Sequence, residues 1–268
     1  MEWFRRRLSR LRTKPRTLHD QQMLRTPGTP RSRTINEIVA GMPTCSTYLE
    51  IGVQLGLTFE AVSVPFKWGV DPKPMFNTSR LPAGSRLSVK TSDDFFRDLN
   101  ESLRFDLIFI DGLHEWRQAY RDLINAFKHA SPQAIIVMDD VIPNDEYSAI
   151  PDQTTAINQR LIETGEVSRF WTGDVFKVIG VVAASHPELS IRVISEAPES
   201  QALIWRDNPQ EEVRPIPESM MPHYDDWSYQ RIFGPDGRKV HPWASTERNS
   251  AISDASSASV KISRSGLG

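Results

Sequence analysis

Apolar residues along the chain recur with two different spacings. From residue 47 to residue 164, short apolar runs typical of buried strands alternate with stretches whose apolar residues lie three or four positions apart, as on one face of a helix. Strands are expected at 47–52, 67–72, 86–91, 105–111 and 134–140, and helices at 55–64, 92–103, 115–130 and 152–164. Three more strands are expected at 175–184, 189–195 and 202–206. This order predicts an α/β fold, a doubly wound and mostly parallel sheet with an antiparallel edge strand.

The two ends of the chain differ in composition from this middle part. Residues 1–33 are rich in arginine and interrupted by prolines, which predicts a basic solvated arm. The alternative is a short amphipathic helix within residues 1–16 that contacts a membrane surface or a partner. Residues 244–268 are rich in serine and poor in large apolar side chains, so a disordered tail is expected there. The folded domain is therefore expected over residues 34–243.

Composition and charge exclude several classes of protein. A net charge of -2 over 268 residues does not fit a chain that binds nucleic acid along its whole length. A single cysteine, Cys45, excludes an internal disulfide framework and a zinc site made of several thiolates. There is neither an apolar run of about 18 residues, which a transmembrane helix needs, nor a signal-peptide pattern. We therefore expect a cytoplasmic protein, and a homo-oligomer stays open.

The residues that follow the expected strands carry the candidate chemistry, because ligands of open α/β sheets bind beyond the carboxyl ends of the strands. Glu50 and Gly52 lie at the end of the first strand, and Gly56 follows in the turn. Their spacing is neither that of a dinucleotide site nor that of a P-loop. Asp71 ends the second strand, where a carboxylate can accept both hydroxyl protons of a ribose; the alternative is an acid of the turn at Pro72.

Three aspartates and a histidine follow the fourth and fifth strands. Asp111 ends the fourth strand, and Asp139 and Asp140 end the fifth. Because neighbouring strands lie about 4.8 Å apart, these carboxylates would repel one another unless a proton or a cation neutralises them. Oxygen ligands of this kind suit Mg²⁺ or a similar divalent ion; the alternative is that these acids only cap turns. His114 is a candidate general base, or otherwise a structural hydrogen-bonding group.

Other polar residues are assigned to the surface. His129 and His186 are expected at a helix end and in a loop, and Lys177 is expected as a solvated side chain at the start of the strand at 175–184.

Several motifs between residues 35 and 185 share a known pattern. They are LEIGVQLGLT, GVDP, TSDDFF, FDLIFIDGLHEWRQAYRDL, IIVMDDVIP and GDVFKVI. Together they resemble the class I S-adenosylmethionine-dependent methyltransferases, which have a Rossmann-like fold. The IDGLHEW stretch resembles the bacterial small-molecule O-methyltransferases, including sugar and natural-product enzymes, whose motif is I-D-G-x-H-x-Y/W. Trp116 stands where tyrosine is commoner in that group.

The resemblance implies a cofactor and a role for each matching residue. Glu50, Gly52 and Gly56 would shape the pocket for the methionine part of S-adenosylmethionine, and Asp71 would hold its ribose. The adenine edge would be bordered by Thr91, Ser92 and Asp93. Asp111, at the end of the fourth strand, would also belong to the cofactor site.

The expected reaction is methyl transfer from S-adenosylmethionine to a hydroxyl of a small-molecule or sugar acceptor. In this hypothesis Asp111, Asp139 and Asp140 hold the divalent ion, and Asp111 and His114 are the catalytic residues. Two alternatives stay open: a metal-dependent nucleotide-sugar transferase that uses the same acids on a diphosphate, and a non-catalytic cofactor-binding module.

Overall fold

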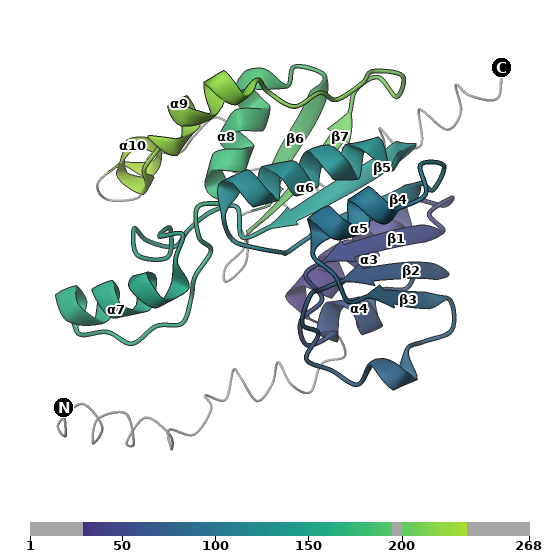
Figure 1. The fold of residues 1–268 in the computed structure, drawn as a ribbon, viewed down its shortest axis with the longest axis horizontal. Coiled ribbons are helices and arrows are strands. Elements are labelled where there is room, and N and C mark those ends of the chain that lie inside the picture. Colours follow the sequence, from purple (N-terminus) through teal and green to yellow (C-terminus); the bar gives the residue numbers. More distant parts are fainter. Residues whose placement is uncertain (1–28, 195–199, 235–268) are drawn as a thin grey trace.

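The computed structural model describes residues 29–194 and 200–234 (Figure 1). Within this part a seven-stranded sheet has the order β3-β2-β1-β4-β5-β7-β6. The strands are β1 (Thr47–Ile51), β2 (Phe66–Val70), β3 (Ser85–Ser88), β4 (Phe105–Ile110), β5 (Ala130–Asp139), β6 (Leu189–Ile194) and β7 (Gln201–Arg206). Strands β1 to β5 are parallel, and β7 pairs antiparallel with both β5 and β6. The predicted Rossmann-like, mostly parallel sheet with an antiparallel edge is confirmed.

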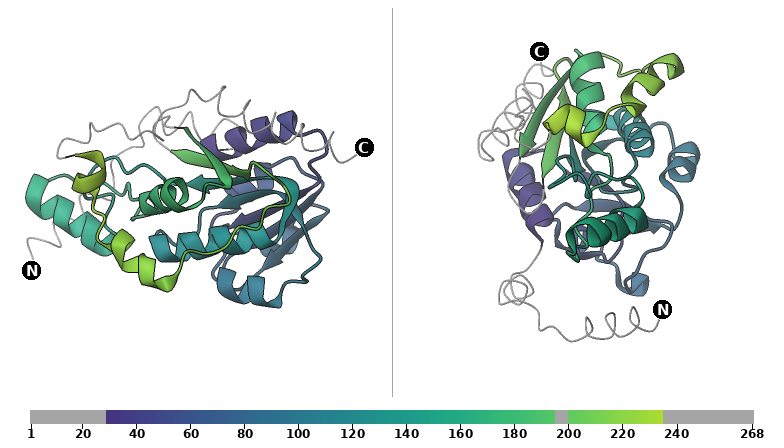
Figure 2. Two further views of the ribbon diagram at one scale, coloured as in Figure 1. Left: turned by 90° about the horizontal axis from the view of Figure 1, so that it is seen from above. Right: turned by 90° about the vertical axis from the view of Figure 1, so that its left-hand side faces the viewer.

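Helices cover both faces of this sheet (Figure 2). They are α3 (Pro30–Gly41), α4 (Leu57–Ala61), α5 (Ser92–Asp98), α6 (Trp116–Lys128), α7 (Gln153–Thr164), α8 (Phe176–Ser185), α9 (Met221–Asp225) and α10 (Tyr229–Phe233), with short 3₁₀ turns η2 (Thr78–Arg80) and η3 (Glu218–Met220). Helices α3 and α4 pack on one face, and α5, α6 and α8 pack on the other. In the described part of the chain no helix is long and apolar enough to cross a membrane.

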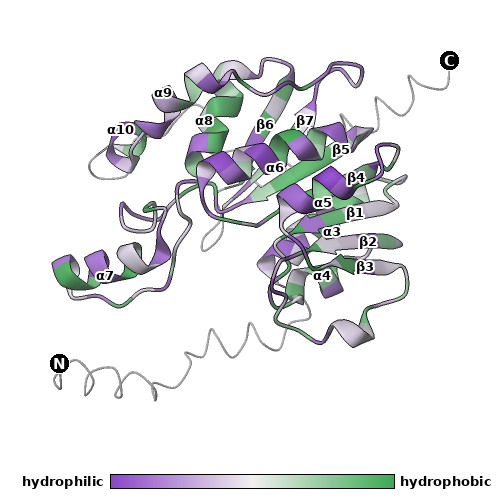
Figure 3. Cartoon of the chain, in the orientation of Figure 1, coloured by the Kyte–Doolittle hydropathy of each residue, from purple (hydrophilic) through white to green (hydrophobic). Residues whose placement is uncertain are grey.

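The central strands are apolar because both of their faces are buried. In β4, Leu107 and Phe109 belong to the core beneath α3 and α4, whereas Ile108 and Ile110 belong to the core beneath α6 and α8. Successive side chains of a strand point to opposite faces, so a strand between two helical layers needs apolar residues at every position. Figure 3 shows the resulting hydrophobic band along β5.

The strand expected at 175–184 is wrong, because this segment forms helix α8. Every residue from Phe176 to Val182 is buried, so the segment lacks the polar face that distinguishes a surface helix from a strand. Lys177 is consequently not solvated: only 9% of its side chain is exposed, and Nζ lies 3.0 Å from Oδ2 of Asp174.

The two histidines assigned to the surface are also buried. His129 makes a 3.3 Å contact between Nδ1 and the carbonyl oxygen of Leu103. His186 lies between the hydroxyl of Tyr120, at 2.9 Å, and a carboxylate oxygen of Glu188, at 2.7 Å. Leu103 and Tyr120, which lie far from these histidines in the sequence, provide polar partners for the two rings. The position of a histidine at a helix end or in a loop does not reveal such partners.

The boundary predicted at residue 33 falls inside helix α3. Thr29 caps this helix in a capping box with Ser32, and Ser32 is itself buried, so the folded part begins at least four residues earlier than expected. The arm over residues 1–28 and the tail over 244–268 lie outside the described residues.

Candidate active site

A cavity of about 890 Å³ opens beyond the carboxyl ends of β1, β2 and β4. This is where the open-sheet rule places ligands. Most residues predicted for the site line it: Gly52, Asp71, Thr91, Ser92, Asp93, Asp111, His114 and Asp140. The other walls come from residues with no predicted role, among them Arg31, Gln54, Gln118, Asp122, Arg169, Phe170 and Trp171.

Gly52 allows the ends of β1 and β4 to meet. Its φ is +87°, and a Cβ atom built on it would lie 1.8 Å from the carbonyl oxygen of Asp111. The amide of Asp111 in turn donates to the carbonyl of Ile51 at 2.8 Å. No side chain fits at position 52, so the cavity floor here is bare backbone.

Asp71 is buried and held rigidly at the end of β2. The amide of Gln54 donates to Oδ2 at 2.8 Å, and the amide of Lys73 donates to Oδ1 at 2.7 Å. Each carboxylate oxygen has about two acceptor positions, so both oxygens retain capacity for a ligand. The geometry fits a residue that is pre-positioned to accept two hydroxyl protons.

Asp122 is a buried acid in the cavity wall that the sequence analysis missed. Burial raises the pKa of its carboxyl to about 6, while hydrogen bonds from Ser92 and Gln118 oppose this shift. Its only sequence signal is a polar residue on the apolar face of the helix at 115–130, which by itself does not indicate a ligand. Asp122 also lies close to Gly112, at the end of β4.

Beyond β4 and β5, two carboxylates and an imidazole converge. Nε2 of His114 lies 3.3 Å from Oδ1 of Asp111 and 3.3 Å from Oδ2 of Asp140. Burial lowers the pKa of His114, but the hydrogen bond with Asp111 and the charges of Asp140 and Asp111 outweigh it, so the pKa is raised. Within the described part of the chain, ligand atoms of these three residues lie within 4.8 Å of one another, close enough to share a metal ion.

Asp139 is not part of this group. Its side chain is fully buried, and Oδ2 pairs with Nε of Arg31 at the start of α3. Burial and the charge of Asp111 raise the pKa of Asp139 well above its ordinary value, and Arg31 opposes them. Asp139 is the last residue of β5, whereas Asp140 follows the strand with a φ of +57°, so the two side chains leave the chain in different directions although the sequence predicts one role for both.

Glu50 and Gly56 likewise do not line the cavity. Glu50 is buried and accepts a 2.6 Å hydrogen bond from the hydroxyl of Tyr48, and burial raises the pKa of its carboxyl to about 8. A Cβ atom on Gly56 would lie 2.9 Å from the ring of Phe76, so this glycine serves packing.

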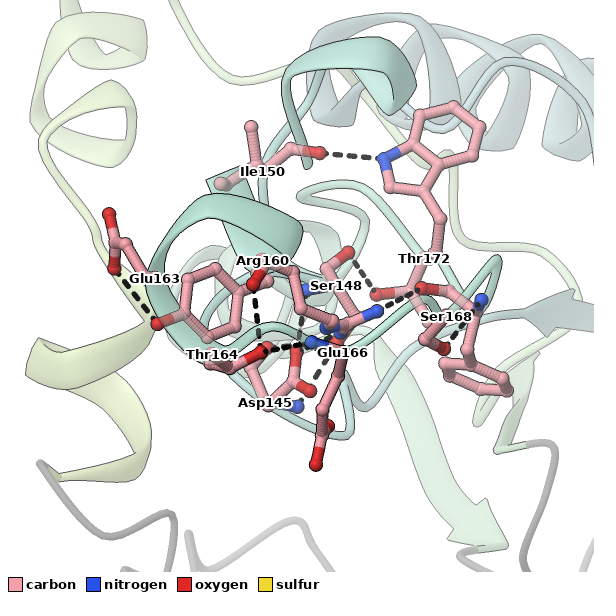
Figure 4. Close-up of polar contacts among 12 residues, drawn as sticks. Asp145, Ser148, Ile150, Arg160, Glu163, Thr164, Glu166, Ser168 and Thr172 are labelled. Carbon is pink, nitrogen blue, oxygen red and sulfur yellow. Dashed lines mark hydrogen bonds and ion pairs between the residues drawn. The ribbon is translucent and has the colours of Figure 1, made fainter. Parts of the chain in front are cut away.

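The connection between β5 and α8 brings aromatic side chains over His114. The indole of Trp171 stacks on the imidazole with 4.6 Å between ring centres and 23° between planes. Its N–H donates to the carbonyl of Ile150 at 2.6 Å. Figure 4 shows the polar contacts that secure this connection, including the pairing of Arg160 with Asp145. These contacts therefore hold the segment in a fixed position.

Residues 49–141 match the family model described as a methyltransferase domain. Over these residues the match confirms the predicted resemblance to methyltransferases. No curated protein matches the chain.

Several solved structures are similar to this chain at low identity. The O-methyltransferase TomG from Streptomyces achromogenes, solved with SAM, is 14% identical with a TM-score of 0.44, covering 74% of this chain and 93% of its own. An O-methyltransferase from Bacillus cereus, solved with SAH, is 13% identical with a TM-score of 0.45, covering 66% and 82%. The N-methyltransferase NodS from Bradyrhizobium japonicum is 14% identical with a TM-score of 0.41, covering 67% and 94%. At these values the likeness assigns neither an acceptor atom nor a substrate to this chain.

Proposed function

We propose that this chain, whose residues 49–141 match a methyltransferase domain, transfers a methyl group from S-adenosylmethionine to a hydroxyl of a small-molecule or sugar acceptor. The observation that carries the proposal is that Asp71, Asp111 and Asp140, all within the matched region, line one cavity beyond the strand ends. Charged and polar groups from three separate strands converge there, as expected of a site that binds two substrates side by side.

Asp71 is the residue assigned to the cofactor ribose. Its two backbone donors fix the carboxylate before any ligand binds, so little ordering is needed on binding. Gly52 would admit the methionine part against bare backbone, and Thr91, Ser92 and Asp93 would border the adenine. Glu50 and Gly56 support this region from outside the cavity.

Asp111 and Asp140 are the residues assigned to a divalent ion. The donor set fits such an ion, because two carboxylates with an imidazole nearby are hard or intermediate ligands. Their two negative charges would also attract a divalent cation. Bound there, a divalent ion would lower the pKa of an acceptor hydroxyl.

His114 is the proposed general base. Nε2 lies 3.3 Å from a carboxylate oxygen of Asp111 and 3.3 Å from one of Asp140, so the ring is placed beside the acids that would hold the ion and the acceptor hydroxyl. The proton of the acceptor hydroxyl would move to Nε2, and Asp111 would stabilise the imidazolium that forms. Trp171 holds the ring in one orientation by stacking on it, and methyl transfer then depends mainly on alignment of donor and acceptor.

The cofactor assignment is tested by calorimetric titration of S-adenosylhomocysteine. Asp71→Ala is expected to weaken binding by about 2–4 kcal/mol, the worth of two hydrogen bonds to a charged acceptor. Asp98→Ala, at the exposed end of α5 and outside the cavity, is the matched control. Wild-type protein that does not bind at millimolar ligand contradicts the proposed function, and unchanged affinity in Asp71→Ala contradicts the role of that residue.

The metal and base assignments are tested with a panel of small phenols and sugars, with the methylated atom identified by mass spectrometry. Chelator and Asp140→Asn should both abolish turnover without weakening cofactor binding. His114→Ala should retain the ion but lose about 10²–10⁴-fold in kcat, and this loss should shrink at high pH. If His114→Ala instead loses the ion, the imidazole is a ligand and not the base. Methylation of an amine rather than a hydroxyl would contradict O-methyl transfer.

A further inference from the structure

The acid cluster already contains a cation, from a segment that the sequence analysis assigned to a solvated arm. Nε of Arg31 pairs with Oδ2 of Asp139 and lies 3.5 Å from Oδ2 of Asp111. A terminal guanidinium nitrogen lies 3.7 Å from Oδ2 of Asp140. One guanidinium therefore touches all three carboxylates, and its side chain is only 26% exposed.

Helix α3 holds Arg31 in this position. Thr29 and Ser32 form a reciprocal capping box, with bonds of 3.1 Å and 2.8 Å, so the turn that carries Arg31 is well ordered. Further along the helix, the side-chain amide of Asn36 donates to the carbonyl of Ala61 at 3.0 Å, which ties α3 to the end of α4. Arg31 is therefore presented by a fixed helix terminus rather than by a loose arm.

The three contacts of Arg31 differ in kind. Asp139 is fully buried, and one of its oxygens, Oδ1, has no hydrogen-bond partner in the described part of the chain. A buried carboxylate needs a counter-charge, and Arg31 supplies it. The contacts with Asp111 and Asp140 are longer, and these two carboxylates face the cavity. Arg31 thus pairs closely with one acid and approaches the two acids that line the cavity.

We propose that Arg31 sets the affinity of the site for a divalent cation, by competing with the ion for Asp111 and Asp140. The inference rests on the metal role proposed above for these two residues. An ion that they bind must lie within a few ångströms of the guanidinium, where like charges repel strongly because the site is largely shielded from water. The ion is therefore held more weakly than two carboxylates and an imidazole alone would hold it.

Removing the charge at position 31 acts in one direction whichever state Asp139 adopts. If Asp139 stays ionised, the site gains a negative charge and attracts the ion more strongly. If Asp139 takes up a proton, the site still loses the positive charge that repelled the ion. Both cases predict tighter binding, so the sign of the effect does not depend on the protonation of Asp139.

The test is a titration of Mn²⁺ into the full-length protein, with free Mn²⁺ measured by electron paramagnetic resonance. Arg31→Gln and Arg31→Met remove the charge, and Met also keeps an unbranched apolar stem. Arg33→Gln is the matched control, because Arg33 lies on the same helix and is exposed. Binding of S-adenosylhomocysteine by each variant verifies that it is folded.

Both variants at position 31 are expected to bind Mn²⁺ at least about tenfold more tightly than wild type, and Arg33→Gln is expected to match wild type. Equal or weaker Mn²⁺ binding by the folded Arg31 variants overturns the inference while leaving the metal proposal intact. If neither wild type nor variants bind Mn²⁺ although S-adenosylhomocysteine still binds, the metal role of Asp111 and Asp140 fails together with this inference, and the cofactor assignment stands.

Discussion

A buried ion pair at the start of α8 holds the loop that carries His114. Oδ2 of Asp174 lies 3.0 Å from Nζ of Lys177, and their side chains are 6% and 9% exposed. Oδ1 of Asp174 accepts the backbone N–H of Trp116 at 2.8 Å, which is the first residue of α6 and lies two residues after His114. Lys177 also donates to the carbonyl of Asp225 at 2.9 Å.

Breaking this pair from either side should be costly. Asp174→Asn keeps an acceptor for the N–H of Trp116 but leaves the charge of Lys177 buried without its partner. Lys177→Met leaves the charge of Asp174 buried without its partner. Loss of one member of a buried pair typically costs about 3–5 kcal/mol, whereas replacing both charges together is often near neutral. The double variant should therefore lose clearly less free energy of unfolding than the two single variants lose in sum.

The assay is urea unfolding of the four members of this double-mutant cycle, with Glu212→Gln as a control at an exposed ion pair with Arg214. The control should show no measurable change, because solvent screens that pair. Small and additive losses for Asp174→Asn and Lys177→Met would refute the reasoning, since additivity means that the two charges do not depend on each other.

Three further predictions follow from named contacts. Burial raises the pKa of Glu50 to about 8 from an ordinary 4.5, so the folded state binds more protons and stability falls as pH rises through that window. Glu50→Gln should reduce this fall between pH 5 and pH 8 in thermal melts; an unchanged fall would contradict it. Deleting residues 1–28 should leave the melting temperature unchanged, whereas deleting 1–33 should lower it by removing the cap of α3; equal effects would contradict this boundary. Gly52→Ala should destabilise the protein far more than Gly165→Ala in urea unfolding: φ is positive at both, but only Gly52 meets backbone atoms; similar losses would show that strain alone matters.

Patterns within single segments predicted most of the sheet. Within the runs at 105–111 and 134–140, residues 107–110 and 134–138 are apolar at every position, as in a strand covered on both faces. The same argument placed Asp71 and Asp111 beyond strand ends, where they now line the cavity together. These features are encoded locally, because strand period and strand ends can be read within about ten residues.

Patterns within single segments gave a wrong prediction where an element is buried on all sides. Helix α8 has no polar face, so its β-branched residues indicated a strand, and the burial of Lys177 was missed with it. Asp139 and Asp140 are neighbours in sequence, yet one faces the interior and the other the cavity. Which of the two lines the cavity depends on the backbone turn after β5, where Asp140 has a φ of +57°.

Sequence alone determined the fold class, the edge of the sheet where the cavity opens and most of the acids found there. Only the tertiary structure decided which groups meet those acids. Arg31 lies 108 positions from Asp139, and Trp171, in the connection between β5 and α8, stacks on His114. Such pairs leave no local signal, because a charge or an aromatic ring is equally compatible with solvent in its own segment. They form only when packing of the helices and strands brings distant parts of the chain within a few ångströms of each other.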